Sequence, residues 1–258
     1  MARYQVILAY DGTDFVGSQR QASTVFSRAA TSRTVQGELE KALRNLGWRG
    51  RSVLLAGRTD TGVHAAGQVA AFDLDWAHTP DELCNALNAH LPADMAARAV
   101  RTALERFHPR FDATSRRYRY RLFCQPIRDP LRERYAWRVW PEVNGGGLVA
   151  LAQVWIGEHD FAAFGSPPRP ASGTVRTVLS AAWQQQGDEW WFDVQANAFL
   201  YRMARRLAYV QVAAAQGRLP AEAVVQALAR QTKIPTGLAP AHGLTLMEVC
   251  YPPFEGLT

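Results

Sequence analysis

The chain has 258 residues, of which 48% are hydrophobic and 20% are charged. This composition is typical of globular proteins, and the length suffices for one large or two small domains. The longest apolar run, near residues 148–157, is too short to span a bilayer. The first residues enter a strand pattern directly, without the layout of a signal peptide. We therefore expect a cytoplasmic protein with no membrane association.

The three cysteines, Cys84, Cys124 and Cys250, lie far apart and form no C-x-x-C pair. An odd number of distant cysteines argues against a disulfide framework and against a cysteine zinc site. The six histidines also lack the spacing of zinc-binding motifs. The sequence therefore predicts no metal site.

The formal net charge of +6 and the sequence pI of about 9.5 modestly favour an acidic partner. Only two of the 29 basic residues are lysines, which genomic composition bias can explain. Residues 98–121 are more informative, because they contain eight arginines against two acidic residues. Arginine side chains suit phosphate oxygens and stack on bases, so this segment favours a nucleic-acid partner.

The elements expected in the first half follow hydrophobic periodicity. Alternation predicts a strand over residues 3–10, and helical spacing predicts a helix over residues 35–46. Thr79, Pro80 and Glu82 match the N-cap, first position and third position of a helix start. Further strands are expected over residues 51–56, 68–74 and 96–102.

The second half has a similar order of elements. Strict alternation predicts a strand over residues 117–123, with tyrosines on one face and arginines on the other. The glycines at 145–147 predict a flexible join before a helix. Other expected strands cover residues 135–140, 175–184, 190–195 and 245–251, and expected helices cover residues 148–157, 199–216 and 221–230. Long polar loops are expected over residues 18–33 and 165–173.

The chain is therefore expected to form two α+β halves, residues 1–107 and residues 108–258. Short strands with helices between them favour mainly antiparallel sheet with helices packed on one face.

One Gly-rich turn combines an acid with a guanidinium. Asp60 and Arg58 lie between Gly57 and Gly62, and apolar strand-like runs precede and follow this turn. A lone carboxylate in such a loop is a candidate catalytic group. The alternative is a turn aspartate that caps its own backbone, and the local sequence alone favours this alternative.

The segment 57–69 resembles the signature of the tRNA pseudouridine synthase A (TruA) family. The matching residues are Gly57-Arg58-Thr59-Asp60-x-Gly62-Val63-His64-Ala65 with Gly67-Gln68-Val69. The resemblance extends in order over nearly the whole chain. It includes Tyr10-Asp11-Gly12-Thr13, Thr34-Val35-Gln36, Leu87-Asn88-Ala89-x-Leu91-Pro92, Phe107-His108-x-Arg110, Arg116-x-Tyr118-x-Tyr120, Gly157-x-His159-Asp160-Phe161 and Ala239-Pro240-Ala241-x-Gly243-Leu244.

This resemblance implies the pseudouridine synthase fold, in which two ferredoxin-like or RRM-like α+β halves form a continuous, mainly antiparallel sheet with a central cleft. It implies an isomerase that detaches uracil from ribose, turns the base and rejoins it through carbon. The family uses no metal and no organic cofactor. It acts on uridines 38, 39 and 40 of the tRNA anticodon stem-loop, as a homodimer.

The resemblance also assigns site residues. It makes Asp60 the catalytic aspartate, which must remain ionised at neutral pH, and Arg205 its partner. Tyr118 is the tyrosine that stacks on the flipped uracil, whereas Tyr120 is expected in the core. Arg58 is expected to face the target base and help to extract it.

Two further residues keep open alternatives. His64 is a weak candidate for RNA contact, and the alternative is a packed turn residue. Leu244 is either an apolar wall against the uracil or part of the core.

Several positions depart from the family pattern. Ser18 stands where tryptophan is usual, Ala204 replaces a valine, and Tyr209 stands at a frequent glycine. The loop over residues 18–33 is also longer than is typical. None of these differences removes a proposed catalytic residue.

Two other function classes fit the sequence less well. An RNA-binding or RNA-folding protein that has lost catalysis would not need Asp60, Tyr118 and Arg205 together. A glycosidase usually needs two facing acids, and the sequence offers no convincing second acid near Asp60.

Overall fold

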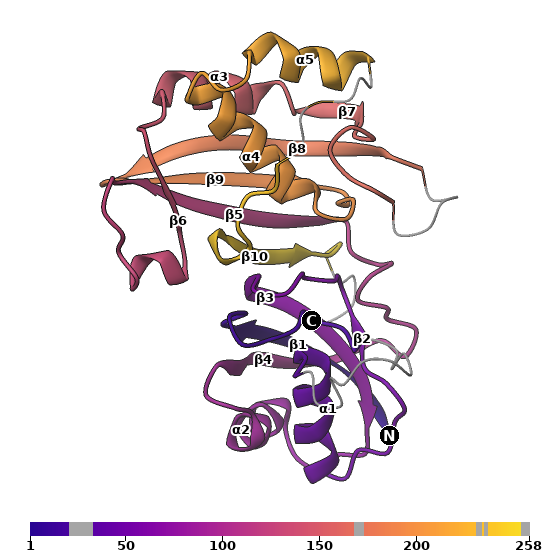
Figure 1. The fold of residues 1–258 in the computed structure, drawn as a ribbon. Coiled ribbons are helices and arrows are strands. Elements are labelled where there is room, and N and C mark those ends of the chain that lie inside the picture. The colour runs from indigo at the N-terminus through magenta and orange to yellow at the C-terminus, as the bar shows by residue number, and fades with distance from the viewer. Residues whose placement is uncertain (21–32, 168–172, 231–233, 235–236, 254–258) are drawn as a thin grey trace, which may run out of the picture. The chain divides into compact units, whose positions relative to one another are not determined.

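The computed structural model describes residues 1–20, 33–167, 173–230, 234 and 237–253 (Figure 1). It divides into two compact units, Met1–Thr114 with Leu246–Thr258, and Ser115–Thr245. We call these unit 1 and unit 2. The halves expected from the sequence divide the chain near the same point but assign its C-terminal end to the second half.

Unit 1 has the order of elements of a split β-α-β fold. Its elements are β1 (Ala2–Tyr10), α1 (Val35–Asn45), β2 (Leu54–Leu55), β3 (His64–Leu74), α2 (Pro80–His90) and β4 (Met95–Ala103). The strands lie in the order β4-β1-β3, with β2 paired to β3 and all these pairs antiparallel. The end of β10 (Leu244–Cys250) also lies next to β3. The order β4-β1-β3, with β2 next to β3, is the ferredoxin-like strand order.

The alternation predicted for β1 determines the core of unit 1. Tyr4, Val6, Leu8 and Tyr10 are all buried, at most 5% exposed, because successive side chains of a strand point to opposite faces. The helices α1 and α2 contact each other, and α2 packs on β4 (Figure 1). The predicted capping box of α2 is confirmed, since Thr79 and Glu82 bond each other's backbone N–H groups.

Unit 2 is also α+β. Its elements are β5 (Ser115–Cys124), β6 (Trp137–Val139), α3 (Gly145–Gln153), β7 (Gly157–Asp160), β8 (Val175–Gln186), β9 (Glu189–Ala196), α4 (Met203–Ala215) and α5 (Ala221–Arg230). The strand order is β5-β9-β8-β7, antiparallel throughout, and β6 pairs with β5 in parallel. The predicted α+β class with mainly antiparallel sheet is therefore confirmed.

The helices of unit 2 pack on the apolar face of its sheet. The helix α3 contacts α4 and β8, and α4 contacts β5 and α5 (Figure 1). Beneath them Trp183 stacks on Phe192 with ring centroids 5.0 Å apart, and its indole N–H donates to Gln211 at 3.0 Å. The buried indole N–H of Trp183 is thus paired within an apolar core.

Two helix predictions in unit 2 were wrong at their N-terminal ends. The glycines at 145–147 form the first turn of α3 rather than a join, because the Asn144 side chain caps the backbone N–H of Gly147 at 3.0 Å. The helix expected over 199–216 begins at Met203, because Arg202 adopts left-handed φ and ψ angles of 63° and 7°. Among the described residues, no helix is long and apolar enough to cross a membrane.

Candidate active site

The loop that carries Asp60 connects β2 to β3. Residues 60–63 form a turn in which the Val63 N–H donates to the Asp60 carbonyl at 3.1 Å, and Gly62 has a φ of 78°. A positive φ at the third position of such a turn favours glycine, which explains Gly62. The Asp60 side chain is half-buried and that of Arg58 is exposed.

Thr59, the residue between them, is fixed by Ser18. The Thr59 N–H donates to the Ser18 hydroxyl at 2.8 Å, and the Ser18 N–H donates to the Thr59 carbonyl at 3.1 Å. Ser18 is fully buried and Thr59 is 6% exposed. Water cannot replace these bonds in a buried place, so they constrain the backbone directly before Asp60.

Tyr10, at the end of β1, contacts the side-chain hydroxyl of Thr59. The two hydroxyls lie 2.9 Å apart, and the Gln68 amide group donates both to the Tyr10 oxygen at 3.4 Å and to the Gly57 carbonyl at 3.0 Å. Burial raises the pKa of Tyr10 to about 12, although its bonds to Thr59 and Gln68 oppose this shift. Tyr10 therefore remains a neutral hydrogen-bonding group at physiological pH.

His64 connects the far side of the loop to the turn after β1. Its Nδ1 accepts a hydrogen bond from the Gly12 N–H at 3.0 Å, and its side chain is 5% exposed. The same nitrogen also lies 3.2 Å from the Asp11 carboxylate. A side chain on Gly12 would overlap the Val63 carbonyl, which explains the glycine there. His64 is thus placed as a packed residue that positions the loop.

Tyr118 and Tyr120 lie on the same face of β5 in unit 2 but differ in burial and contacts. Tyr118 is 8% exposed and packs edge-on against Phe199, with ring centroids 4.9 Å apart. Tyr120 is 1% exposed, and its hydroxyl donates to the Pro240 carbonyl at 2.9 Å. Burial raises the pKa of Tyr120 well above its usual value, and the charge of Arg205 opposes this shift. The expected core position of Tyr120 is confirmed.

Arg205 lies in the first turns of α4. Its Nε donates to the Ala239 carbonyl at 2.8 Å, next to the carbonyl that Tyr120 bonds. Two side chains therefore fix the segment that leads into Leu244. Leu244 itself is 5% exposed and begins β10.

The structure thus places Asp60 and Arg58 on one loop of unit 1 and His64 at the start of β3, whereas Tyr118, Arg205 and Leu244 lie in unit 2. Among the described residues, no cluster of histidine, cysteine or acidic side chains could hold a metal ion.

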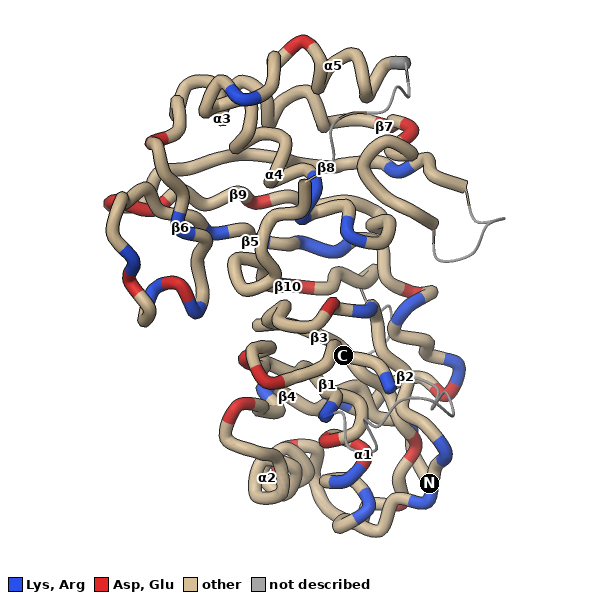
Figure 2. The backbone as a smooth tube through the Cα atoms, in the orientation of Figure 1, with Lys and Arg blue, Asp and Glu red and all other residues tan. Residues whose placement is uncertain are grey.

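Part of the arginine-rich segment is already neutralised. Arg119 makes two hydrogen bonds to the Asp193 carboxylate at 2.8 and 2.9 Å, and Arg121 makes two to Glu189 at 2.9 and 3.0 Å. Both guanidinium groups also flank Trp191, at 4.2 and 5.9 Å from its ring. Figure 2 shows basic positions along β5 and acidic positions along β9. Their charges are therefore compensated within the unit.

Comparison with known proteins places the chain in one enzyme family. A family model described as tRNA pseudouridine synthase matches residues 6–112 and 151–252. The chain belongs to the tRNA pseudouridine synthase family. Proteins named tRNA pseudouridine synthase A from Chloroflexus aurantiacus and Brevibacillus brevis are each 39% identical to it. The alignments cover 98% of this chain and 90% of the first protein, and 97% of this chain and 100% of the second.

A further relative agrees in the family, whereas the similarity to solved structures is low. A tRNA pseudouridine synthase A from Limosilactobacillus fermentum is 35% identical over 97% of this chain and 96% of that protein. Among solved structures, a chain of a Cbf5-Nop10-Gar1 complex aligns with a TM-score of 0.34 and 11% identity. That alignment covers 80% of this chain and 44% of the other, and supports no inference.

The sequence alone did not reveal the residues that fix the Asp60 loop. Tyr10 and Gln68 lie within the family-like motifs, but only the structure shows that both lie close to Thr59 and Gly57. The sequence shows Ser18 as a departure from the family pattern, but it does not indicate that Ser18 bonds to Thr59. For Tyr10 and Gln68 the available signal was a polar side chain within a predicted strand, whereas Ser18 lies outside the strands.

The first prediction concerns Tyr10 and alkaline pH. A folded-state pKa above the unfolded value of about 10 means that the native state retains the proton longer. Tyr10 contributes about 2–3 kcal/mol to the free energy of unfolding in this way. This contribution is fully present below pH 10 and is lost as the pH rises towards 12. We measure the free energy of unfolding in urea between pH 9 and 12. We expect it to fall less steeply with pH in Tyr10→Phe than in wild type.

Tyr201→Phe is the matched control, because Tyr201 is 53% exposed. An alkaline loss in Tyr10→Phe as steep as that of Tyr201→Phe would contradict the role assigned to Tyr10.

The second prediction concerns Ser18. Ser18→Ala leaves the buried N–H of Thr59 without its acceptor, so we expect the free energy of unfolding to fall by about 1–3 kcal/mol. Ser180→Ala, at an exposed position of β8, should change it by no more than about 0.5 kcal/mol. Equal unfolding midpoints for the two variants in urea would show that the Ser18–Thr59 bonds do not constrain the loop.

Proposed function

We propose that this protein converts uridine to pseudouridine at positions 38, 39 and 40 of the tRNA anticodon stem-loop. The observation that carries the proposal is family membership over nearly the whole chain, together with an aspartate in the matching loop whose backbone is fixed on both sides. The relatives that align over nearly the whole chain are named tRNA pseudouridine synthase A.

Asp60 is the catalytic carboxylate in this proposal. The reaction breaks the bond from ribose to a uracil nitrogen and forms a bond from ribose to a uracil carbon. The hydrogen on that carbon leaves as a proton, and the freed ring nitrogen takes up a proton. A carboxylate either adds to one of the reacting carbons or stabilises the charge that develops there. The backbone bonds of Thr59 support this role, because a fixed loop keeps the carboxylate in position without reorganisation.

The other site residues complete the proposal. Arg205 pairs with Asp60 and favours its ionised form, and Tyr118 stacks on the extracted uracil. Arg58, which is exposed, contacts the RNA and helps to move the base out of the stack. Leu244 supplies an apolar surface near the base. His64 acts through the loop, because its ring is buried against the Gly12 backbone.

The partners and location follow the same reasoning. The protein acts on tRNA in the cytoplasm as a homodimer, without a metal or organic cofactor, and its positive net charge favours an RNA partner.

The third prediction tests catalysis. With tRNA that carries tritium on the uracil carbon, we expect wild type to release tritium and Asp60→Asn to release none, because the amide cannot act as a carboxylate. Asp60→Asn should still bind tRNA, as measured by filter retention.

Wild type that binds tRNA without releasing tritium would favour an RNA-binding protein without catalysis. Equal release by wild type and Asp60→Asn would remove the assignment of Asp60.

A further inference from the structure

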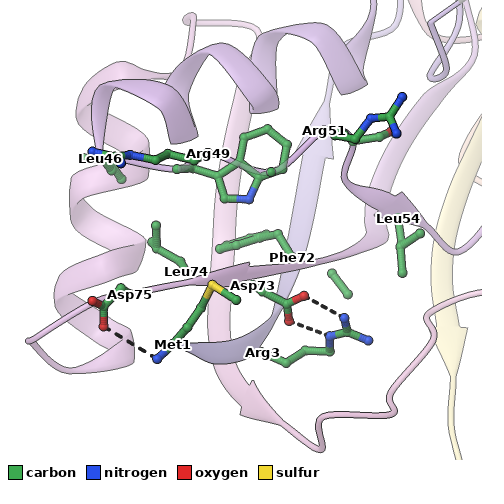
Figure 3. Close-up of a pocket in the computed structure, with 15 residues that line it drawn as sticks. Met1, Arg3, Leu46, Arg49, Arg51, Leu54, Phe72, Asp73, Leu74 and Asp75 are labelled. Carbon is green, nitrogen blue, oxygen red and sulfur yellow. Dashed lines mark hydrogen bonds and ion pairs between the residues drawn. The ribbon is translucent and has the colours of Figure 1, made fainter.

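Unit 1 has a groove of about 850 Å³ beside the edge of β3 (Figure 3). One wall is the connection between α1 and β2, which includes Arg49 and Arg51, and the other is the end of β3 with Arg3 on β1. The strand β2 pairs with Ala71 and Ala70 of β3, and the groove begins where this pairing stops. It is therefore a feature of the sheet edge.

The shape of the connection is determined by Trp48. Its indole is 5% exposed and lies against Gly50, where a Cβ atom would overlap the ring. Gly50 thus allows the chain to pass closely over the indole. Arg49 and Arg51, on either side of Gly50, have exposed side chains (Figure 3).

The charges in the groove are unequal. The Asp73 carboxylate is already bonded to Arg3 by two contacts of 2.7 Å, and Asp75 lies 3.7 Å from the Met1 ammonium. Within the described residues, neither Arg49 nor Arg51 has a hydrogen-bond or ion-pair partner. Their two positive charges are therefore uncompensated, in contrast to those of Arg119 and Arg121.

Asp73 and Asp75 line the same groove but are bonded to Arg3 and to the Met1 ammonium, so the guanidinium groups of Arg49 and Arg51 are left to bind phosphate oxygens. The groove also lies within reach of the Asp60 loop. Nine residue steps separate Arg51 from Asp60, so the two are at most about 30 Å apart. A nucleic-acid duplex presents roughly one phosphate for every 1.7 Å of its axis, so a bound stem offers several phosphates over that distance.

We propose that Arg49 and Arg51 form a phosphate-binding site for the backbone of the RNA substrate, separate from the residues at the target base. This inference rests on the proposed function. The site adds affinity and orients the RNA, but it takes no part in the reaction at the base.

The test compares the salt dependence of tRNA binding by wild type, Arg49→Gln, Arg51→Gln and the double variant. Each phosphate contact contributes about 0.7–0.9 to the slope of log K against log salt concentration. We expect each single variant to lower the slope by about this amount and the double variant by about twice as much. Tritium release at saturating tRNA should stay at the wild-type rate.

Arg128→Gln is the matched control, because it removes one charge from an arginine that is 72% exposed but paired with Glu133 at 3.0 Å. Its slope should equal that of wild type. A double variant with the wild-type slope, or with no larger change than the control, would overturn the site. Wild type that fails to release tritium would instead contradict the proposed function.

A second arm distinguishes an RNA backbone from a free phosphate ion. Wild type and the double variant are each titrated with inorganic phosphate in a calorimeter. We expect the two proteins to give the same heats, with no saturable binding that is specific to wild type. Saturable phosphate binding that is lost in the double variant, with an unchanged tRNA slope, would overturn the proposal in favour of a small-anion site.

Discussion

The backbone of Thr59 is the constraint on which the candidate active site depends. Its N–H and carbonyl both bond to Ser18, and its hydroxyl contacts Tyr10. All these groups are buried, so any displacement of the loop would leave polar atoms unpaired at a cost of about 1–3 kcal/mol each. Asp60 follows directly in the chain and is therefore held by bonds that its own side chain does not make.

Unit 2 uses the same principle around a different segment. Tyr120 and Arg205 bond the neighbouring carbonyls of Pro240 and Ala239, just before β10. Both side chains come from elements whose apolar residues form the core, so packing determines where their polar ends lie. The arginines on the opposite face of β5 are instead paired with acids of β9. Arg119 and Arg121 are thus compensated by acids of β9, whereas Arg49 and Arg51 of unit 1 have no ion-pair partner among the described residues.

Periodicity predicted most elements of the fold, because burial on one face produces it directly. The helix from Val35 and the strand that carries Tyr120 were expected from the sequence. The start of α4 was not, because the left-handed backbone of Arg202 has no signal in its residue type. Asp60 was found through resemblance, while the role of Ser18 required the structure, since Ser18 and Thr59 are 41 residues apart. Sequence patterns report local periods, and they do not report which distant polar groups meet.

The most direct test of this account is a double-mutant cycle on the single-turnover rate of pseudouridine formation. The variants are Ser18→Ala, Tyr10→Phe and the two combined. Both side chains bond to Thr59. Once one substitution has released the loop, the second substitution should therefore lower the rate by a smaller factor. The account predicts that the double variant loses less than the sum of the single effects, by about 0.5–3 kcal/mol. Effects that add within error, or single variants with the wild-type rate, would contradict it.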